Sequence, residues 1–233
     1  KNVKQSVNSI KMKQILVPVD FSDCAINASN YVIAMATVLT ASLHFCHAIK
    51  IPANNPMSGL IVWPLEEYAD IKNQADQNLA FFVAQFSKAN SDILITQSTE
   101  VGTVKEVVNK LCEEKKIDMV VIGLAGANKI EQFVIGSNSK MLIEKTKTPI
   151  LLVPKQASFD GLKKIAFATD LRESDVNAVH QLASICYAFG SDILLTHVAS
   201  KDKSTENKVK HFLNCITNKI NYGIFMTFTA SLS

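Results

Sequence analysis

The residues best suited to chemistry are three glycines and a serine, spaced Gly-x2-Gly-x9-Gly-Ser over Gly123, Gly126, Gly136 and Ser137. They lie close together although the whole chain holds only 8 glycines. Glycine lets backbone N–H groups approach an oxyanion closely, and a helix that begins after such a loop adds free N–H groups and a positive dipole end. The spacing favours a phosphate cradle, but glycines that only form tight turns would give the same pattern.

Two better-known phosphate loops do not fit the sequence. A Rossmann fingerprint places Gly-x-Gly-x-x-Gly after the first strand, where this chain reads DFSDCA without a glycine. A Walker A loop requires Gly-Lys-Ser/Thr, but here Gly136 and Ser137 are followed by Asn138.

The elements that must position this loop follow a regular alternation. Short apolar runs at 14–20, 42–49, 92–97, 117–123 and 149–154 predict buried strands. Between them, helical patterns cover 24–40, 65–90, 104–111 and 138–145, and Thr103 and Glu106 have capping-box spacing. This alternation predicts an α/β fold with an open parallel sheet.

The first strand–helix–strand pattern occurs twice. Residues 11–50 align without gaps on 161–200, so that Asp20 matches Asp170 and His47 matches His197. A helix over 207–220 and a strand over 224–229 follow, but no glycine loop does. We therefore predict a complete domain over residues 12–155 and an incomplete second copy over 161–233. The incomplete sheet should leave an exposed edge, so we expect either association with another chain or a C-terminus truncated relative to an ancestral tandem protein.

Three features together resemble the universal stress protein family. They are PVDFS at the end of the first strand, His47-Ala48 near the end of the second, and the glycine loop after the fourth. The resemblance runs from Met12 to Pro154 and is to the family's ATP-binding branch. It implies a five-stranded sheet of order 3-2-1-4-5 with helices on both faces, which would place Asp20 opposite Gly123 at a ligand-binding crevice.

The resemblance also implies roles for individual residues. Asp20 would contact the adenosine portion, Ala48 would offer backbone polar groups to adenine, and Ile122 would pack beside the ribose. Pro18 and Val19 would line the pocket. The residues around the phosphates would be Gly123, Gly126, Gly136, Ser137 and Asn138, with Ser139 nearby. Ala125 stands where many family members have a basic residue or histidine, so an AMP-like ligand stays open as an alternative.

The expected ligand is ATP, with AMP or ADP as alternatives and Mg²⁺ accompanying ATP. The expected partner is a second copy of the chain, unless the two halves pair within one chain. Three functions stay open: a nucleotide-binding stress-response protein, a structural module with a vestigial site, and a slow ATP hydrolase. No catalytic residue is assigned.

Composition argues against several other classes. The net charge is only +3 and no basic face stands out, so we expect no nucleic-acid partner. The longest apolar run, 31–39, is too short to span a bilayer, and residues 1–13 lack a signal-peptide stretch. The 5 cysteines include no Cys-x-x-Cys, and His44 and His47 point to opposite faces of a strand. We therefore expect a cytoplasmic protein without a metal site.

Overall fold

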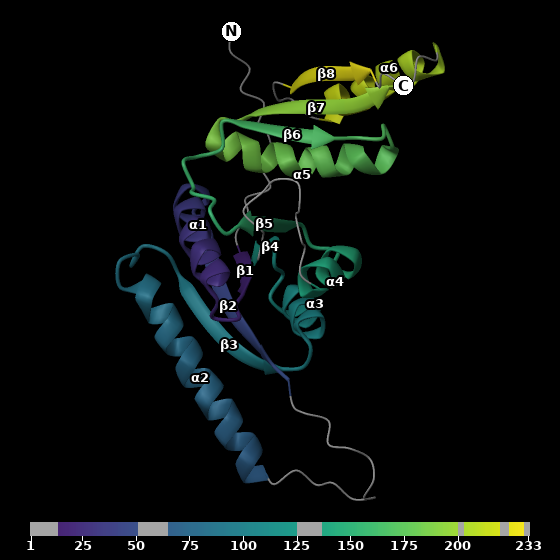
Figure 1. The fold of residues 1–233 in the computed structure, drawn as a ribbon. Coiled ribbons are helices and arrows are strands. Elements are labelled where there is room, and N and C mark those ends of the chain that lie inside the picture. Colours follow the sequence, from purple (N-terminus) through teal and green to yellow (C-terminus); the bar gives the residue numbers. More distant parts are fainter. Residues whose placement is uncertain (1–13, 51–64, 125–136, 200–202, 220–223, 231–233) are drawn as a thin grey trace, which may run out of the picture. The chain divides into compact units, whose positions relative to one another are not determined.

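The computed structural model describes residues 14–50, 65–124, 137–199, 203–219 and 224–230 (Figure 1). The chain divides into two compact units. The N-terminal unit spans Met12–Phe159, and the C-terminal unit contains Asp160–Ser233. Each unit has a sheet of its own, and the paired strands in both sheets are parallel.

The N-terminal unit alternates strands and helices from end to end. Its sheet has the order β3-β2-β1-β4-β5, as predicted. The central strand β1 contributes Ile15, Leu16 and Val17, each at most 1% exposed, as a sheet covered on both faces requires. The elements are β1 (Gln14–Pro18), α1 (Asp23–Leu39), β2 (Ser42–Ile49), α2 (Leu65–Ser87), β3 (Ile95–Val101), α3 (Val104–Glu114), β4 (Met119–Leu124), α4 (Ser137–Lys145) and β5 (Ile150–Pro154).

Helices cover both faces of this sheet. On one face, the ring of Phe45 from β2 lies 6.4 Å from that of Phe82 and 6.2 Å from that of Phe86, both on α2. On the other face, Leu16 belongs to a buried cluster with Leu111 of α3 and Leu142 of α4. The two faces therefore have separate cores, and the predicted fold class is confirmed.

The helix ends that face the carboxyl edge of the sheet are defined by side-chain caps. Ser22 precedes α1, and its Oγ accepts a hydrogen bond from the N–H of Ala25 at 3.3 Å. Thr103 and Glu106 form the predicted capping box at the start of α3. Such caps satisfy N–H groups that have no partner within the helix, so the first turns of α1 and α3 are well defined.

The strand predicted over 92–97 is wrong at both ends. Asp92 and Ile93 lie in a turn, Leu94 is 68% exposed, and β3 begins only at Ile95 and continues to Val101. The apolar letters of Ile93 and Leu94 suggested an earlier start. The register with β2 decides the true bounds, because each residue from Ile95 to Val101 pairs with one from Leu43 to Ile49.

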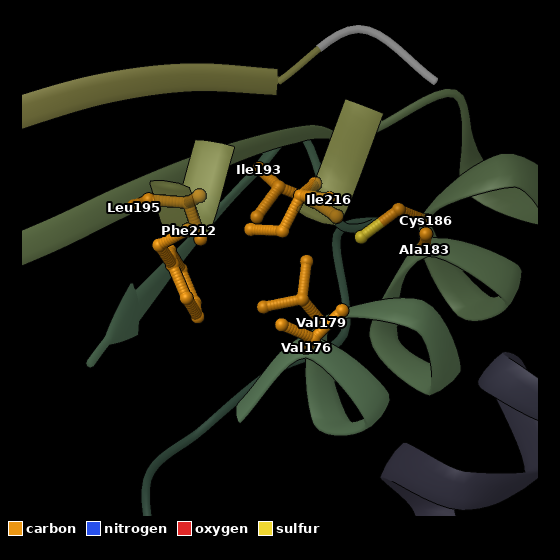
Figure 2. Packing of buried hydrophobic residues seen from close by; sticks show 8 residues of the cluster. All are labelled: Val176, Val179, Ala183, Cys186, Ile193, Leu195, Phe212 and Ile216. Atoms are coloured by element: carbon orange, nitrogen blue, oxygen red, sulfur yellow. The ribbon is translucent and has the colours of Figure 1, made fainter. Parts of the chain in front are cut away.

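The C-terminal unit is smaller, with sheet order β6-β7-β8. Side chains from α5, β7 and α6 converge in one buried cluster (Figure 2). The two helices thus share one core on the same sheet. The elements are β6 (Lys164–Ala168), α5 (Glu173–Phe189), β7 (Asp192–Ala199), α6 (Lys203–Lys219) and β8 (Ile224–Ala230).

The register of this sheet repeats that of the first at a constant offset. Gln14 pairs with Ser42 in the N-terminal unit, and Lys164 pairs with Asp192 in the C-terminal unit. Both pairs are separated from their counterparts by the offset of 150 found in the sequence. Among the described strands, only β7 lies beside β6, so the predicted incomplete sheet has an unpaired edge there.

Candidate functional site

The order of strands places a topological switch point, the position of the predicted crevice, at the carboxyl edge of the N-terminal sheet. β1 and β4 are neighbours, with Leu16 opposite Val120, yet the chain leaves β1 toward β2 and leaves β4 toward β5. The connections after these two strands therefore diverge. In open α/β sheets this switch point is where ligands bind.

Gly123, near the end of β4, packs directly on the backbone of α1. A Cβ atom at this position would lie 2.3 Å from the carbonyl oxygen of Cys24 and 2.6 Å from its carbonyl carbon. Both are backbone atoms, so only glycine fits without displacing the helix. This contact explains the glycine by packing alone. It also brings the first turn of α1 to the end of β4, on the side where Asp20 follows β1.

Asp20 is exposed and is fixed by the residue two positions further on. Its Oδ1 accepts hydrogen bonds from the Oγ of Ser22 at 2.6 Å and from the N–H of Ser22 at 3.1 Å. Within the described residues these contacts engage Oδ1 and not Oδ2. The carboxylate therefore has a defined orientation and an acceptor oxygen that can serve a ligand hydroxyl or amine.

The backbone of Ala48 faces the crevice. Cys46 O accepts from Val19 N at 2.9 Å, whereas Ile49 O accepts from Gly102 N at 3.0 Å. Backbone groups of successive strand residues point to alternate sides, so those of Ala48 point the same way as those of Cys46, toward β1. Because β1 ends at Pro18, opposite Cys46, the N–H and C=O of Ala48 lie beyond the last paired residue.

The turn between β1 and α1 is closed by a histidine. The Nδ1–H of His47 donates to the carbonyl oxygen of Val19 at 2.8 Å. Two residues after Val19, Phe21 has a left-handed backbone conformation, with φ 64°, and its ring centroid lies 4.5 Å from that of His47. This hydrogen bond engages Nδ1 of His47, so the histidine stabilises the turn that follows β1.

Comparison with family models identifies the protein family that has this arrangement. Residues 11–154 match the model of the universal stress protein family. The chain belongs to the universal stress protein family. The matched residues cover every element of the N-terminal unit, so the predicted resemblance is confirmed.

Individual universal stress proteins resemble the chain at modest identity. Universal stress protein MJ0577 of Methanocaldococcus jannaschii is 25% identical over 161 residues, which cover 64% of this chain and 99% of that protein. A crystal structure of a universal stress protein from Archaeoglobus fulgidus superposes with a TM-score of 0.75 at 16% identity. It covers 95% of this chain and 79% of that one, and at this identity it supports the fold. Another solved universal stress protein, in complex with cAMP, is 21% identical, with 62% of this chain and 98% of that chain covered and a TM-score of 0.40.

The structure brings together only part of the predicted universal stress protein site. Val19 is buried beneath the turn, and Ile122 is half-buried beside the core of α3 and α4. The side chains of Ser137, Asn138 and Ser139 lie outside the described residues, although α4 begins at Ser137 as predicted within one residue. Gly126 and Gly136, with Ala125, also lie outside them. Described residues with a place at or beside the crevice are therefore Pro18, Val19, Asp20, Ala48, Ile122 and Gly123.

The role of Ser22 could not be recognised from the sequence pattern of the site residues. This residue both caps α1 and holds the carboxylate of Asp20. The available signal was an aspartate two residues before a serine at a helix start, a pattern that favours local side-chain hydrogen bonds. Cys24 was missed as well, because its contribution is a backbone carbonyl that no residue type reveals.

The C-terminal unit repeats the turn but not the surroundings. The Nδ1–H of His197 donates to Thr169 O at 2.8 Å, as His47 does to Val19. Asp170, however, forms an ion pair with Arg172 at 3.2 Å. The sole arginine of the chain therefore lies beside this carboxylate, in an ion pair that is exposed on both sides.

Histidine and the other metal-ligating side chains do not form a metal site in the described parts of the chain. His44 is buried, with Nδ1 2.7 Å from Thr96 Oγ1 and Nε2 3.1 Å from Ser98 Oγ. Burial, reinforced by Lys115 and opposed by Glu100, lowers the pKa of His44 to about 4. None of the described helices combines the length and apolar character needed to cross a membrane.

Proposed function

We propose that the N-terminal unit binds an adenine nucleotide, preferably ATP, and that the protein acts in the cytoplasm as a nucleotide-responsive stress protein. The observation that carries this proposal is the oriented carboxylate of Asp20, which Ser22 holds after β1 beside the switch point with β4. The contact of Gly123 with Cys24 brings the start of α1 to the end of β4 and so supports this arrangement.

The adenosine portion would be recognised by groups from β1 and β2. The N–H and C=O of Ala48 face the crevice beyond the end of β1 and form a donor–acceptor pair of the kind that an adenine edge needs. The carboxylate of Asp20, held through Oδ1, would accept from a ribose hydroxyl through Oδ2. Pro18, Val19 and Ile122 would supply the apolar walls.

The phosphates would lie at the start of α4. Gly123, Gly126 and Gly136 would let the backbone approach them, and Ser137, Asn138 and Ser139 would present the N–H groups of the first helical turn. Mg²⁺ bound with ATP would be held by phosphate oxygens, since the described residues offer no metal-ligating cluster. AMP or ADP would use the same adenosine contacts.

We assign no comparable role to the C-terminal unit. It is proposed to be a partial second copy, over residues 161–233, with the turn of the nucleotide half but without its glycine loop. Asp170 also pairs with Arg172, whereas the carboxylate of Asp20 is held by Ser22. Its role would be structural, through contact with the first copy or with a second chain.

A second candidate function rests on a specific observation. Gly123 is required by packing whether or not a ligand is present, so the glycine alone does not demand a nucleotide. If the N-terminal unit binds no nucleotide, the protein is an interaction module with a vestigial nucleotide site. A partner would then bind at the unpaired edge of β6. The third candidate function is slow ATP hydrolysis, and no described residue is assigned to it.

Nucleotide binding can be tested on the purified protein. Heat or acid releases any co-purified nucleotide for chromatography, and calorimetry measures binding of ATP, ADP and AMP. The variant Gly136→Val places a branched side chain in the phosphate loop and should abolish binding of ATP more than that of AMP. Absence of co-purified nucleotide, together with no heat of binding at millimolar ATP, would exclude the proposal and favour the interaction module.

A further inference from the structure

A hollow lies on the face of the N-terminal sheet that α2 covers. It has a volume of about 480 Å³, within the range of small-molecule sites. One wall comes from the turn and strand end at Phe21, His47 and Ile49, and the other comes from the first half of α2. The side chains of His47 and Ile49 alternate with Ala48, so they project to the opposite face from the Ala48 side chain.

The floor of the hollow is apolar and preformed. Ile49 is 7% exposed, and Ala75 on α2 is 9% exposed. The ring of Phe21 is held between His47, with centroids 4.5 Å apart, and Phe82, with centroids 5.6 Å apart in an edge-on arrangement. A planar or aliphatic body could therefore lie against these side chains without any of them having to move.

The polar groups of the hollow are mainly hydrogen-bond acceptors. Because the Nδ1–H of His47 donates to Val19 O, the neutral ring keeps an acceptor lone pair on Nε2. Gln74 donates through Nε2 to Asn78 Oδ1 at 3.0 Å, which leaves Gln74 Oε1 as an acceptor. Asp70 adds a carboxylate and is the one charged residue in the lining. The amide groups of Gln74 and Asn78 can also donate, so it is the carboxylate of Asp70 that favours a positively charged ligand over a negatively charged one.

We propose that this hollow binds a small organic ammonium compound, a primary amine with an aromatic or short aliphatic body. The ammonium group lies at Asp70, with Gln74 and His47 as further acceptors. The body packs on Ile49 and Ala75 and against the face of Phe21, where a cation also gains from the aromatic ring. This site shares no side chain with the proposed nucleotide site, so it is independent of that proposal.

The test uses the full chain and two probes of matched shape. NMR titrations compare 2-phenylethylamine, which carries an ammonium, with phenylacetate, which carries a carboxylate. We expect the amine to bind about tenfold more tightly than the anion, with shifts centred on the backbone of 47–49 and 70–78. Replacement of Asp70 by asparagine should weaken amine binding about threefold to fivefold, as expected for a partly exposed ion pair.

Two bulky substitutions locate the probe. Ala75→Phe fills the floor of the hollow, and Ile71→Trp narrows its rim from a residue that is already 37% exposed. Both should abolish amine binding, whereas Ala80→Phe, on the exposed side of α2, should leave it unchanged. Equal binding of the two probes, or amine binding that persists in both filled variants, would overturn the proposal, as would the absence of saturable binding.

Discussion

The imidazole of His47 is tied to the backbone of Val19, 28 residues earlier, by a hydrogen bond of 2.8 Å from Nδ1 to the carbonyl oxygen. The same bond, of the same length, joins His197 to Thr169 in the C-terminal unit. Phe21 lies two residues after Val19, and Leu171 lies two residues after Thr169. Both have a left-handed backbone conformation, with φ 64° and φ 61°. The histidine therefore belongs to a turn that occurs in both units, and its Nδ1 is engaged in each.

Replacement of either histidine by leucine should lower the free energy of unfolding by about 1 kcal/mol, because one intramolecular hydrogen bond is lost. Urea unfolding followed by circular dichroism measures the effect. His47→Leu should also weaken binding of ATP, since Val19 and Asp20 lie in the turn that the bond holds. His197→Leu should not.

Asparagine serves as the control for His47, because its Nδ2 can donate in place of Nδ1. His47→Asn should restore most of the stability and of the nucleotide affinity. Equal losses of ATP affinity in His47→Leu and His197→Leu would contradict the assignment of the site to the N-terminal unit.

Asp20 and Asp170 provide a matched pair of carboxylates. Asp20→Asn keeps an Oδ1 for Ser22 but removes the charge, so the fold should persist while ATP affinity falls about tenfold, as for a hydrogen bond to a charged acceptor. Asp170→Asn removes an ion pair with Arg172 that is exposed on both sides and should leave ATP affinity unchanged. Calorimetry on both variants measures this difference, and unchanged affinity in Asp20→Asn would remove that residue from the site.

Much of this fold could be predicted from the sequence because its signals are local. The apolar runs of β1 and β4, the capping box of Thr103 and Glu106, and the constant offset between the two units are all visible in the residue order. The bounds of β3 could not be predicted in this way. They depend on pairing with β2, a contact between residues about fifty positions apart.

In the candidate site, too, only the residues with a local sequence signal could be predicted. Gly123 and Asp20 are conspicuous residue types at strand ends, whereas the partner that makes Gly123 necessary is a backbone carbonyl of Cys24. The hollow beside α2 could not be predicted from the sequence either, because Asp70, Gln74 and Asn78 have the pattern of an ordinary exposed helix face. These residues line a hollow only because the Phe21 ring and the β2 side chains lie opposite them.

The buried His44 should make stability depend on pH. Its pKa is lowered to about 4 in the folded protein, first by burial and then by Lys115. Between the ordinary value of about 6.5 and this value, the unfolded chain binds a proton that the folded chain does not. Stability is therefore full above about pH 6.5 and falls by up to about 1.4 kcal/mol per pH unit as the pH decreases toward 4.

Urea unfolding at a series of pH values measures this slope. The variant His44→Gln removes the titrating group while keeping a polar side chain near Thr96 and Ser98, so its slope over this range should be shallower. His211→Gln, at an exposed position on α6, is the control and should retain the slope of the unmodified protein. Parallel curves for all three proteins would show that His44 titrates normally.

Gly123→Ala tests the contact on which the crevice depends. The added Cβ would lie 2.3 Å from Cys24 O, and neither the helix backbone nor the paired strand can yield cheaply, so the free energy of unfolding should fall by about 1–3 kcal/mol. Gly190→Asn is the control: Gly190 has φ 63° with nothing within 4 Å of a Cβ, and asparagine tolerates this conformation. Thr40, at the equivalent position of the first copy, already carries a side chain at φ 52°. Gly190→Asn should therefore cost less than Gly123→Ala in the same urea titration. If Gly123→Ala is as stable as the unmodified protein, α1 does not touch β4 at Cys24, and the start of α1 is not held at the end of β4 as described.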